Sequence, residues 1–158
     1  MQIAAVFWAR VIGTAIPRNH DYLRELGAAE AIDYNQDDWA AAVREAAPEG
    51  VDAVLECAGG ETLGRILEVV RDGGHVAYIV PVDEEPRPTR GIAVHFFGRR
   101  PDRGRFAALA ARFYARELAV RLEDVLSLEE VAQAHERVEA GHTRGKIVLR
   151  SSESQKEG

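Results

Sequence analysis

The sequence predicts an α/β protein built around a doubly wound parallel sheet. Strand-like and helix-like runs alternate along nearly the whole chain, which is typical of parallel strands joined by crossover helices. Small-residue turns follow several of the strand-like runs, and open parallel sheets bind ligands at such strand ends. The 158 residues, 46% of them hydrophobic, suffice for one core. We therefore expect one domain over residues 1–150 and a polar, disordered tail over 151–158.

The first half of the chain predicts three strands and three helices in alternation. The strands are the β-branched or apolar runs 10–14, 31–33 and 51–56, which small or polar residues bound. The helices are 20–26, which Gly27 caps, 37–47, which Pro48 ends, and 61–71, which stops at Gly73–Gly74. The last of these carries Leu63, Ile66, Leu67 and Val70 on one face at helical spacing.

The second half continues the alternation with three strands and two helices. The strands are expected at 75–80, 92–97 and 146–149. The helix over 103–116 is rich in alanine, and the helix over 128–140 gathers Val131, Ala134 and Val138 on one face. Three prolines and mixed charge make residues 81–90 a loop.

Composition excludes several classes of partner and site. A net charge of −6 disfavours nucleic acid and anionic membrane as partners. One cysteine rules out an internal disulfide, and no apolar run approaches the roughly 18 residues of a membrane-spanning helix. The five histidines show no metal-ligand spacing, so no metal site is expected. Without a leader-like opening, the cytoplasm is the expected compartment.

The loop after the first strand predicts a phosphate contact. It contains no carboxylate, which NAD-binding proteins use to hold the ribose 2′-hydroxyl. It offers Thr14, Arg18 and Asn19 instead, side chains that suit a 2′-phosphate through charge-assisted hydrogen bonds. The alternative is an ordinary polar loop in which Asn19 caps the next helix.

The turn after the third strand is made of small residues that let a flat ligand approach the backbone. It reads Glu56-Cys57-Ala58-Gly59-Gly60, and Val80-Pro81 would cover the same ligand from the next strand. The alternative is a plain strand-to-helix turn, and the two interpretations are compatible. Cys57 is expected to be a buried space-filling side chain rather than a nucleophile, because no basic group is evident to lower its pKa.

These segments together carry a family resemblance. The order RVIGTA, LRELGAAEAIDY, GVDAVLECAGG, LEVVRDGGHVAYIV, HFF and LSLEEVAQAHERVEAGHTRGKIVL resembles the C-terminal half of the medium-chain dehydrogenase/reductase superfamily, in its NADPH-dependent quinone oxidoreductase branch. The resemblance implies a Rossmann-type doubly wound sheet over residues 1–150 that lacks its first strand, the glycine-rich turn and the N-terminal catalytic domain. Trp8, in place of the family's glycine, is a departure.

The resemblance also implies positions for a bound NADP(H). The 2′-phosphate side would be lined by Thr14, Arg18, Asn19 and Tyr34. The ribose and pyrophosphate would lie along Cys57, Ala58, Gly59 and Gly60, and the nicotinamide would lie near Val80, Pro81, Phe96 and Phe97. Lys146 would lie close to the cofactor. The family's glycine after the Ile-Val pair is absent here. Because Phe96 and Phe97 point to opposite faces of a strand, at least one is expected in the core.

The implied function is the cofactor-binding part of a zinc-independent NADPH-dependent oxidoreductase that reduces a quinone, enone or related carbonyl compound. No residue is assigned as catalytic, so activity of this chain alone is an open question. The alternatives are a non-catalytic nucleotide-binding or dimerisation module, and a different Rossmann-type protein such as a methyltransferase. The expected partners are a small-molecule substrate and a second copy, paired through the edge strand 92–97.

The missing first strand would lie between strands 10–14 and 51–56. Either these two strands pair directly in a contracted sheet, residues 2–7 fill the place, or the chain is unstable alone, and contraction or instability is favoured. The family's alignment places Met1 on a valine inside a helix. A longer reading frame, an artificially shortened chain and a gene that has lost its front half all remain open.

Overall fold

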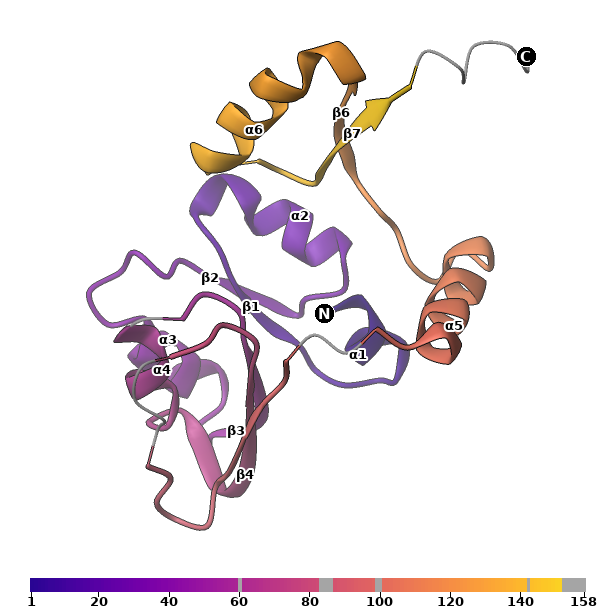
Figure 1. Ribbon diagram of the computed structural model, residues 1–158. Helices are drawn as coiled ribbons and strands as arrows, with labels where there is room; N and C mark the ends of the chain where they lie inside the picture. Colours follow the sequence, from indigo (N-terminus) through magenta and orange to yellow (C-terminus); the bar gives the residue numbers. More distant parts are fainter. Residues whose placement is uncertain (60, 83–86, 99–100, 142, 152–158) are drawn as a thin grey trace. The chain divides into compact units, whose positions relative to one another are not determined.

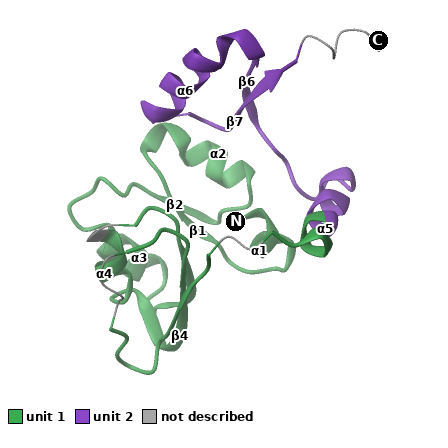
Figure 2. Ribbon diagram, viewed as in Figure 1, with its two compact units in different colours: residues 1–106 green, residues 107–158 purple. Residues whose placement is uncertain are grey.

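A computed structural model gives the fold, and it describes residues 1–59, 61–82, 87–98, 101–141 and 143–151. The chain forms two compact units, residues 1–106 and 107–158 (Figure 2). The expected domain boundaries, 1–150 and 151–158, stay a prediction. No helix within the described ranges has the length and apolar character needed to cross a membrane.

Unit 1 alternates strands and helices as the sequence predicts (Figure 1). Its elements are α1 (Gln2–Val6), β1 (Ile12–Thr14), the 3-10 helix η1 (Pro17–Asn19), α2 (His20–Glu25), β2 (Glu30–Ile32), α3 (Trp39–Ala46), β3 (Val51–Glu56), α4 (Glu61–Ile66), β4 (Val70–Tyr78) and β5 (Ala93–Phe96). Helix α5 (Arg103–Tyr114) runs from unit 1 into unit 2. Asp38 starts α3, because its side chain accepts a hydrogen bond from the backbone N–H of Ala41 at 3.0 Å.

The strands of unit 1 form two parallel sheets. Strand β1 pairs with β2, and β4 lies between β3 and β5. This is the doubly wound strand order, except that no backbone hydrogen bonds link β1 to β3. The favoured contraction is therefore wrong, since β1 and β3 do not pair with each other. The alternative that residues 2–7 supply a strand is also wrong, since Gln2–Val6 is helical.

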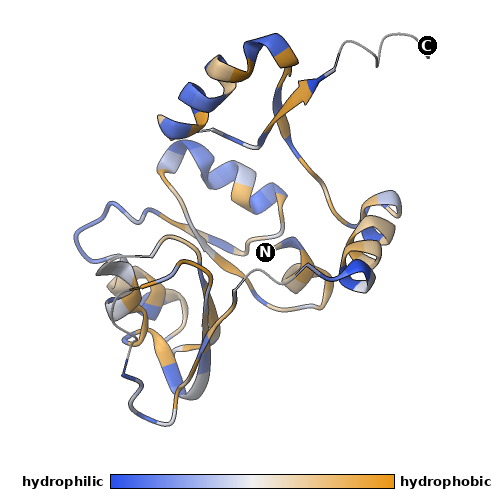
Figure 3. Ribbon diagram, viewed as in Figure 1, coloured by the Kyte–Doolittle hydropathy of each residue, from blue (hydrophilic) through white to orange (hydrophobic). Residues whose placement is uncertain are grey.

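Helix α3 packs against both sheets, so the sheets share a core although no backbone hydrogen bonds join them. Ala40 and Val43 of α3 are buried in a cluster with Ile32 of β2, and Ile12 of β1 and Val54 of β3 pack against the same cluster. Apolar burial is non-directional, so α3 can join the two sheets without backbone hydrogen bonds between them. Helix α2 contributes less, since Leu23 is its one buried residue, and Figure 3 colours it mainly blue.

The helix expected over 61–71 is shorter than predicted. It ends at Ile66, and Val70 begins β4, where it pairs with Val51. The prediction failed because an apolar residue can be buried on a helix face or in a strand, and the sequence pattern alone does not distinguish the two. In the structure Val70 is 1% exposed and lies in the strand. The expected stop at Gly73–Gly74 is an irregularity inside β4, where the register to β3 shifts.

Besides most of α5, the described part of unit 2 holds a two-stranded parallel sheet with a helical connection. Strand β6 (Leu122–Ser127) pairs with β7 (Lys146–Arg150), and the 3-10 helix η2 (Leu128–Glu130) and α6 (Val131–Glu139) connect them. The sequence did not predict β6, because its run Leu-Glu-Asp-Val-Leu-Ser lacks the preceding glycine and the following small-residue turn that mark β3. Ser127 and Glu130 form a capping box that starts the helix.

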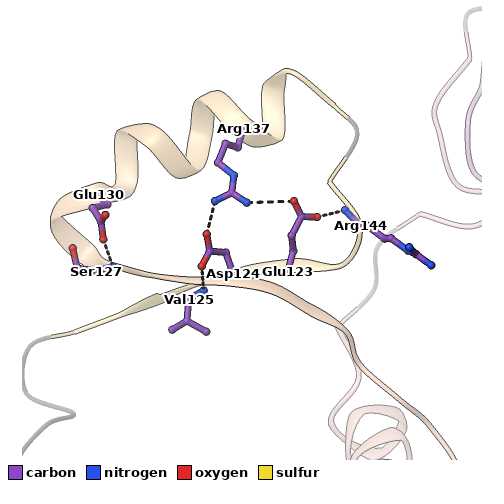
Figure 4. A network of polar contacts seen from close by, with 7 residues as sticks. All are labelled: Glu123, Asp124, Val125, Ser127, Glu130, Arg137 and Arg144. Atoms are coloured by element: carbon purple, nitrogen blue, oxygen red, sulfur yellow. Dashed lines mark hydrogen bonds and ion pairs between the residues drawn. The ribbon is translucent and has the colours of Figure 1, made fainter. Parts of the chain in front are cut away.

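A network of charges ties α6 to β6 (Figure 4). The guanidinium of Arg137 donates to the carboxylate of Asp124 at 2.5 Å and to that of Glu123 at 3.3 Å. Glu123 also accepts a hydrogen bond from the backbone N–H of Arg144, which precedes β7. Hydrogen bonds from Arg137 and from the backbone N–H of Val125 lower the pKa of Asp124 below its ordinary value.

This network predicts that acid destabilises unit 2. Because the pKa of Asp124 is lower in the folded chain, its contribution is complete above the ordinary aspartate pKa of about 3.9 and is lost as the pH falls through the folded value. The chain should therefore lose more thermal stability between about pH 5 and pH 3 than its Asp124→Asn variant. Melting followed by NMR on β6, β7 and α6 measures the difference. Glu136→Gln is the control variant. Equal losses of thermal stability in the unchanged chain and in Asp124→Asn would contradict the expectation.

Candidate functional site

The residues expected at the 2′-phosphate lie after β1 and β2. Thr14 ends β1 and is exposed, Arg18 lies in η1 with an exposed side chain, and Asn19 is half-buried. Tyr34 follows β2 and is 51% exposed. The pairing of Thr14 with Ile32 brings the ends of these two strands together. The sequence therefore placed three of these polar side chains on one short loop and the fourth on the neighbouring strand's end.

Arg18 is available to a ligand. Within the described residues its guanidinium makes no hydrogen bond or ion pair, and it stands at the exposed 3-10 turn directly after β1. The neighbouring carboxylate, Asp33 after β2, is occupied with Asn35, whose backbone N–H and side-chain amide both donate to it. The alternative that Asn19 caps the next helix is confirmed in position, since Asn19 is the N-cap of α2, although its side chain makes no capping hydrogen bond.

A histidine that the sequence did not single out shapes this loop. The ring of His20 lies with Nε2 2.9 Å from the carbonyl oxygen of Ala15. A carbonyl only accepts, so Nε2 carries the proton and donates. Ala15 also donates its backbone N–H to the carbonyl of Ile32 at 2.9 Å. The two contacts hold the loop at both of its ends. In the sequence, the signal for this role of His20 was its position directly after the candidate residues.

The second group of expected residues surrounds the carboxyl ends of β3 and β4. Glu56, the last residue of β3, is 4% exposed, although it carries a charge. Its carboxylate accepts from the backbone N–H of Ala58 at 2.7 Å and from that of Gly59 at 2.8 and 2.9 Å. The sequence analysis assigned Glu56 no role. Its signal was a charged residue at the end of the strand, directly before the small-residue turn.

Gly59 is needed for both its conformation and its size. Its φ of +75° lies in the left-handed region, and a Cβ there would stand 2.8 Å from Cγ1 of Val80. The turn after β3 is thereby packed against Val80, the second residue after β4. Pro81 is exposed, and the expectation that these residues cover one ligand stays a prediction.

The expectation that Cys57 is buried is wrong. Its side chain is exposed because the turn directs it away from the core that Glu56 enters. Partial burial, followed by the negative charge of Glu56, raises the pKa of the thiol above its ordinary value. At neutral pH the side chain is therefore a thiol, which supports the interpretation that it is no nucleophile.

Phe96, the last residue of β5, and Phe97, which follows it, are both about half exposed, at 48% and 56%. The expectation that at least one of them lies in the core is wrong, since β5 is the edge strand of its sheet and both side chains are exposed. Phe96 packs on the buried ring of Tyr78, with the ring centroids 5.2 Å apart. The pairing of two copies along this outer edge stays a prediction.

Two further residues, Lys146 and Gly60, were expected at the cofactor. Lys146 is exposed at the start of β7 in unit 2. Gly60 lies outside the described residues. Among the residues that the structure describes, no three His, Cys, Asp or Glu side chains gather as a metal site would require.

Comparison with known proteins gives a consistent family. The family model described as zinc-binding dehydrogenase matches residues 26–149. A probable mitochondrial zinc-binding oxidoreductase of Arthroderma benhamiae is 28% identical over 144 residues, which cover 89% of this chain and 44% of that protein. This chain thus spans less than half of that relative's length.

Solved structures show the same fold. An NAD-dependent alcohol dehydrogenase superimposes with a TM-score of 0.83 at 26% identity, over 94% of this chain and 46% of its own. The quinone oxidoreductase from Coxiella burnetii superimposes with a TM-score of 0.79 at 25% identity, over 94% of this chain and 47% of its own. The α/β class with parallel sheets is thereby confirmed.

Proposed function

Because the chain belongs to the zinc-binding dehydrogenase family of nicotinamide-nucleotide-dependent oxidoreductases, we propose that it is the NADP(H)-binding part of a zinc-independent enzyme. The cofactor would supply the hydride, and the protein would orient its nicotinamide towards a quinone, enone or related carbonyl substrate. The family match makes the methyltransferase alternative unnecessary.

The loop after β1 carries the preference for NADP(H) over NAD(H). A 2′-phosphate needs an unpaired cation and a hydroxyl donor, and Arg18 and Thr14 offer both at exposed positions. A 2′-hydroxyl would need a free carboxylate at the end of β1, and Thr14 stands there. Asp33, after the next strand, already accepts two hydrogen bonds from Asn35. The donor set therefore fits a phosphate better than a hydroxyl.

Zinc independence is proposed from the resemblance to the quinone oxidoreductase branch of the family. The substrate class rests on the resemblance to quinone oxidoreductases, one of which is among the solved structures of the same fold.

Replacing Arg18 with alanine tests the proposal. A charge-assisted hydrogen bond contributes about 1.5–3 kcal/mol, so the dissociation constant for NADPH should rise by roughly tenfold to a hundredfold. The constant for NADH, which lacks the phosphate, should not change. Fluorescence titration measures both.

The matched control is Arg24→Ala, which removes an exposed arginine from α2 that pairs with Asp21 at 2.8 Å. It should leave both constants unchanged. Equal weakening of NADPH and NADH by Arg18→Ala, or no weakening of either, would contradict a 2′-phosphate contact at this loop.

A further inference from the structure

The buried carboxylate of Glu56 points to a role in the proposed cofactor site. We infer that Glu56 is a positioning residue that holds the turn 57–59 closed and turns it into a surface for the uncharged nicotinamide–ribose end of the cofactor rather than for its phosphates. This inference rests on the proposed function.

The first step of the argument is burial. Glu56 is the one charged residue among the buried positions that the structure describes, and it is 4% exposed. An ionised carboxylate is costly to bury unless hydrogen bonds compensate it. Three contacts of 2.7–2.9 Å from two backbone N–H groups provide that compensation. The side chain is therefore committed to the turn and is no longer available to a substrate.

The second step concerns what the turn has left to offer. Turns that bind phosphate do so with backbone N–H groups directed at the anion. Here the N–H groups of Ala58 and Gly59 are directed at Glu56 instead. A phosphate at this turn would find the N–H groups of Ala58 and Gly59 already hydrogen-bonded and would be repelled by the nearby carboxylate. An uncharged group is not repelled and does not require these N–H groups, and Gly59 allows its close approach.

The third step is the connection to β4. The backbone N–H of Ile79 donates to the carbonyl of Glu56 at 3.2 Å, and Gly59 lies against Val80. Glu56 thus holds its turn against the end of β4, where the resemblance expects the nicotinamide. Movement of the turn would change the shape of that end of the site and leave the loop of Arg18 untouched.

The test uses three variants of the full 158-residue chain. Glu56→Ala removes all acceptors, Glu56→Gln keeps one acceptor oxygen and the shape, and Glu49→Gln is an exposed control on the loop before β3. Two ligands are titrated into each: NADPH, and 2′,5′-ADP, which contains the 2′-phosphate but no nicotinamide. NMR hydrogen exchange is measured in the absence of ligand at the amides of Ala58 and Gly59, with buried Val76 as the internal reference.

The expected result is local. In Glu56→Ala the amides of Ala58 and Gly59 exchange about tenfold faster or more, as a lost hydrogen bond to a charged group implies, while Val76 keeps its protection. NADPH binds about tenfold more weakly, and 2′,5′-ADP binds as before. Glu56→Gln lies between Glu56→Ala and the unchanged chain, and Glu49→Gln has no effect.

Three results would overturn the inference. NADPH that binds Glu56→Ala as well as or more tightly than the unchanged chain would show that the turn does not position the cofactor, or that its freed N–H groups bind phosphate. Equal weakening of both ligands with lost protection at Val76 would mark a merely structural role. If the unchanged chain binds neither ligand, the proposed function fails first, and unprotected amides at Ala58 and Gly59 would then refute the closed turn separately.

Discussion

Replacing Ile66 with alanine is expected to destabilise the chain by about 2–5 kcal/mol, the range found when a buried isoleucine is truncated. Ile66 is 4% exposed at the end of α4 and belongs to a buried cluster with Val70, Val76, Tyr78 and Ile92. The first three of these partners lie on β4, and Ile92 directly precedes β5, so Ile66, together with Leu63, packs α4 against that sheet. The loss should appear as a lower denaturation midpoint in urea, followed by circular dichroism.

The control makes the same chemical change where no core exists. Ile79, directly after β4, is 47% exposed, and its replacement by alanine should cost about 1 kcal/mol or less. Comparable losses for the two variants would mean that α4 does not pack on β4 as described.

Replacing Gly50 with alanine should have the second large effect, about 2–4 kcal/mol, because two costs add. The φ of Gly50 is +85°, a conformation that costs an alanine roughly 1 kcal/mol or more. In addition, the new Cβ would stand 2.6 Å from the backbone nitrogen of Arg71 and 3.0 Å from the carbonyl oxygen of Val69. These are main-chain atoms at the start of β4, which cannot move without breaking the contact of Val51 with Val69.

Gly73→Ala separates the two costs. Its φ is +67°, yet nothing lies within 4 Å of the position that a Cβ would occupy. This variant should therefore lose only the conformational part, roughly 1 kcal/mol. Chemical denaturation of both variants measures the difference, and equal losses would contradict the close approach between the α3–β3 loop and β4.

The sequence predicted the elements whose signals are local. Strand β3 has the expected bounds, because Gly50 precedes its run and a small-residue turn follows it. The sequence failed where a tertiary contact decides the conformation. Val70 entered a strand because Val51 pairs with it, and β6 formed from a weak strand sequence because β7 and the Arg137 network stabilise it. Neither partner is close in sequence, so no local pattern could reveal it.

The candidate site divides in the same way. Thr14 and Arg18 were predicted from residue type and position after a strand, and the structure finds both exposed. Glu56 was missed, and Cys57 was placed inside, because burial at the end of β3 depends on which side chain the turn directs inward. The hydrogen bonds to Ala58 and Gly59 decide that question, and they appear only in three dimensions.

The most direct test of the account is a thermal-unfolding titration of the chain with NADPH and, separately, with NADH. A ligand that binds only the folded state raises the midpoint, by about 2.7 kcal/mol of stability at a hundredfold excess over its dissociation constant. The account predicts a saturable rise with NADPH and a much smaller one with NADH at the same concentrations. Equal responses would contradict the 2′-phosphate site, and no response to either would contradict cofactor binding by this chain.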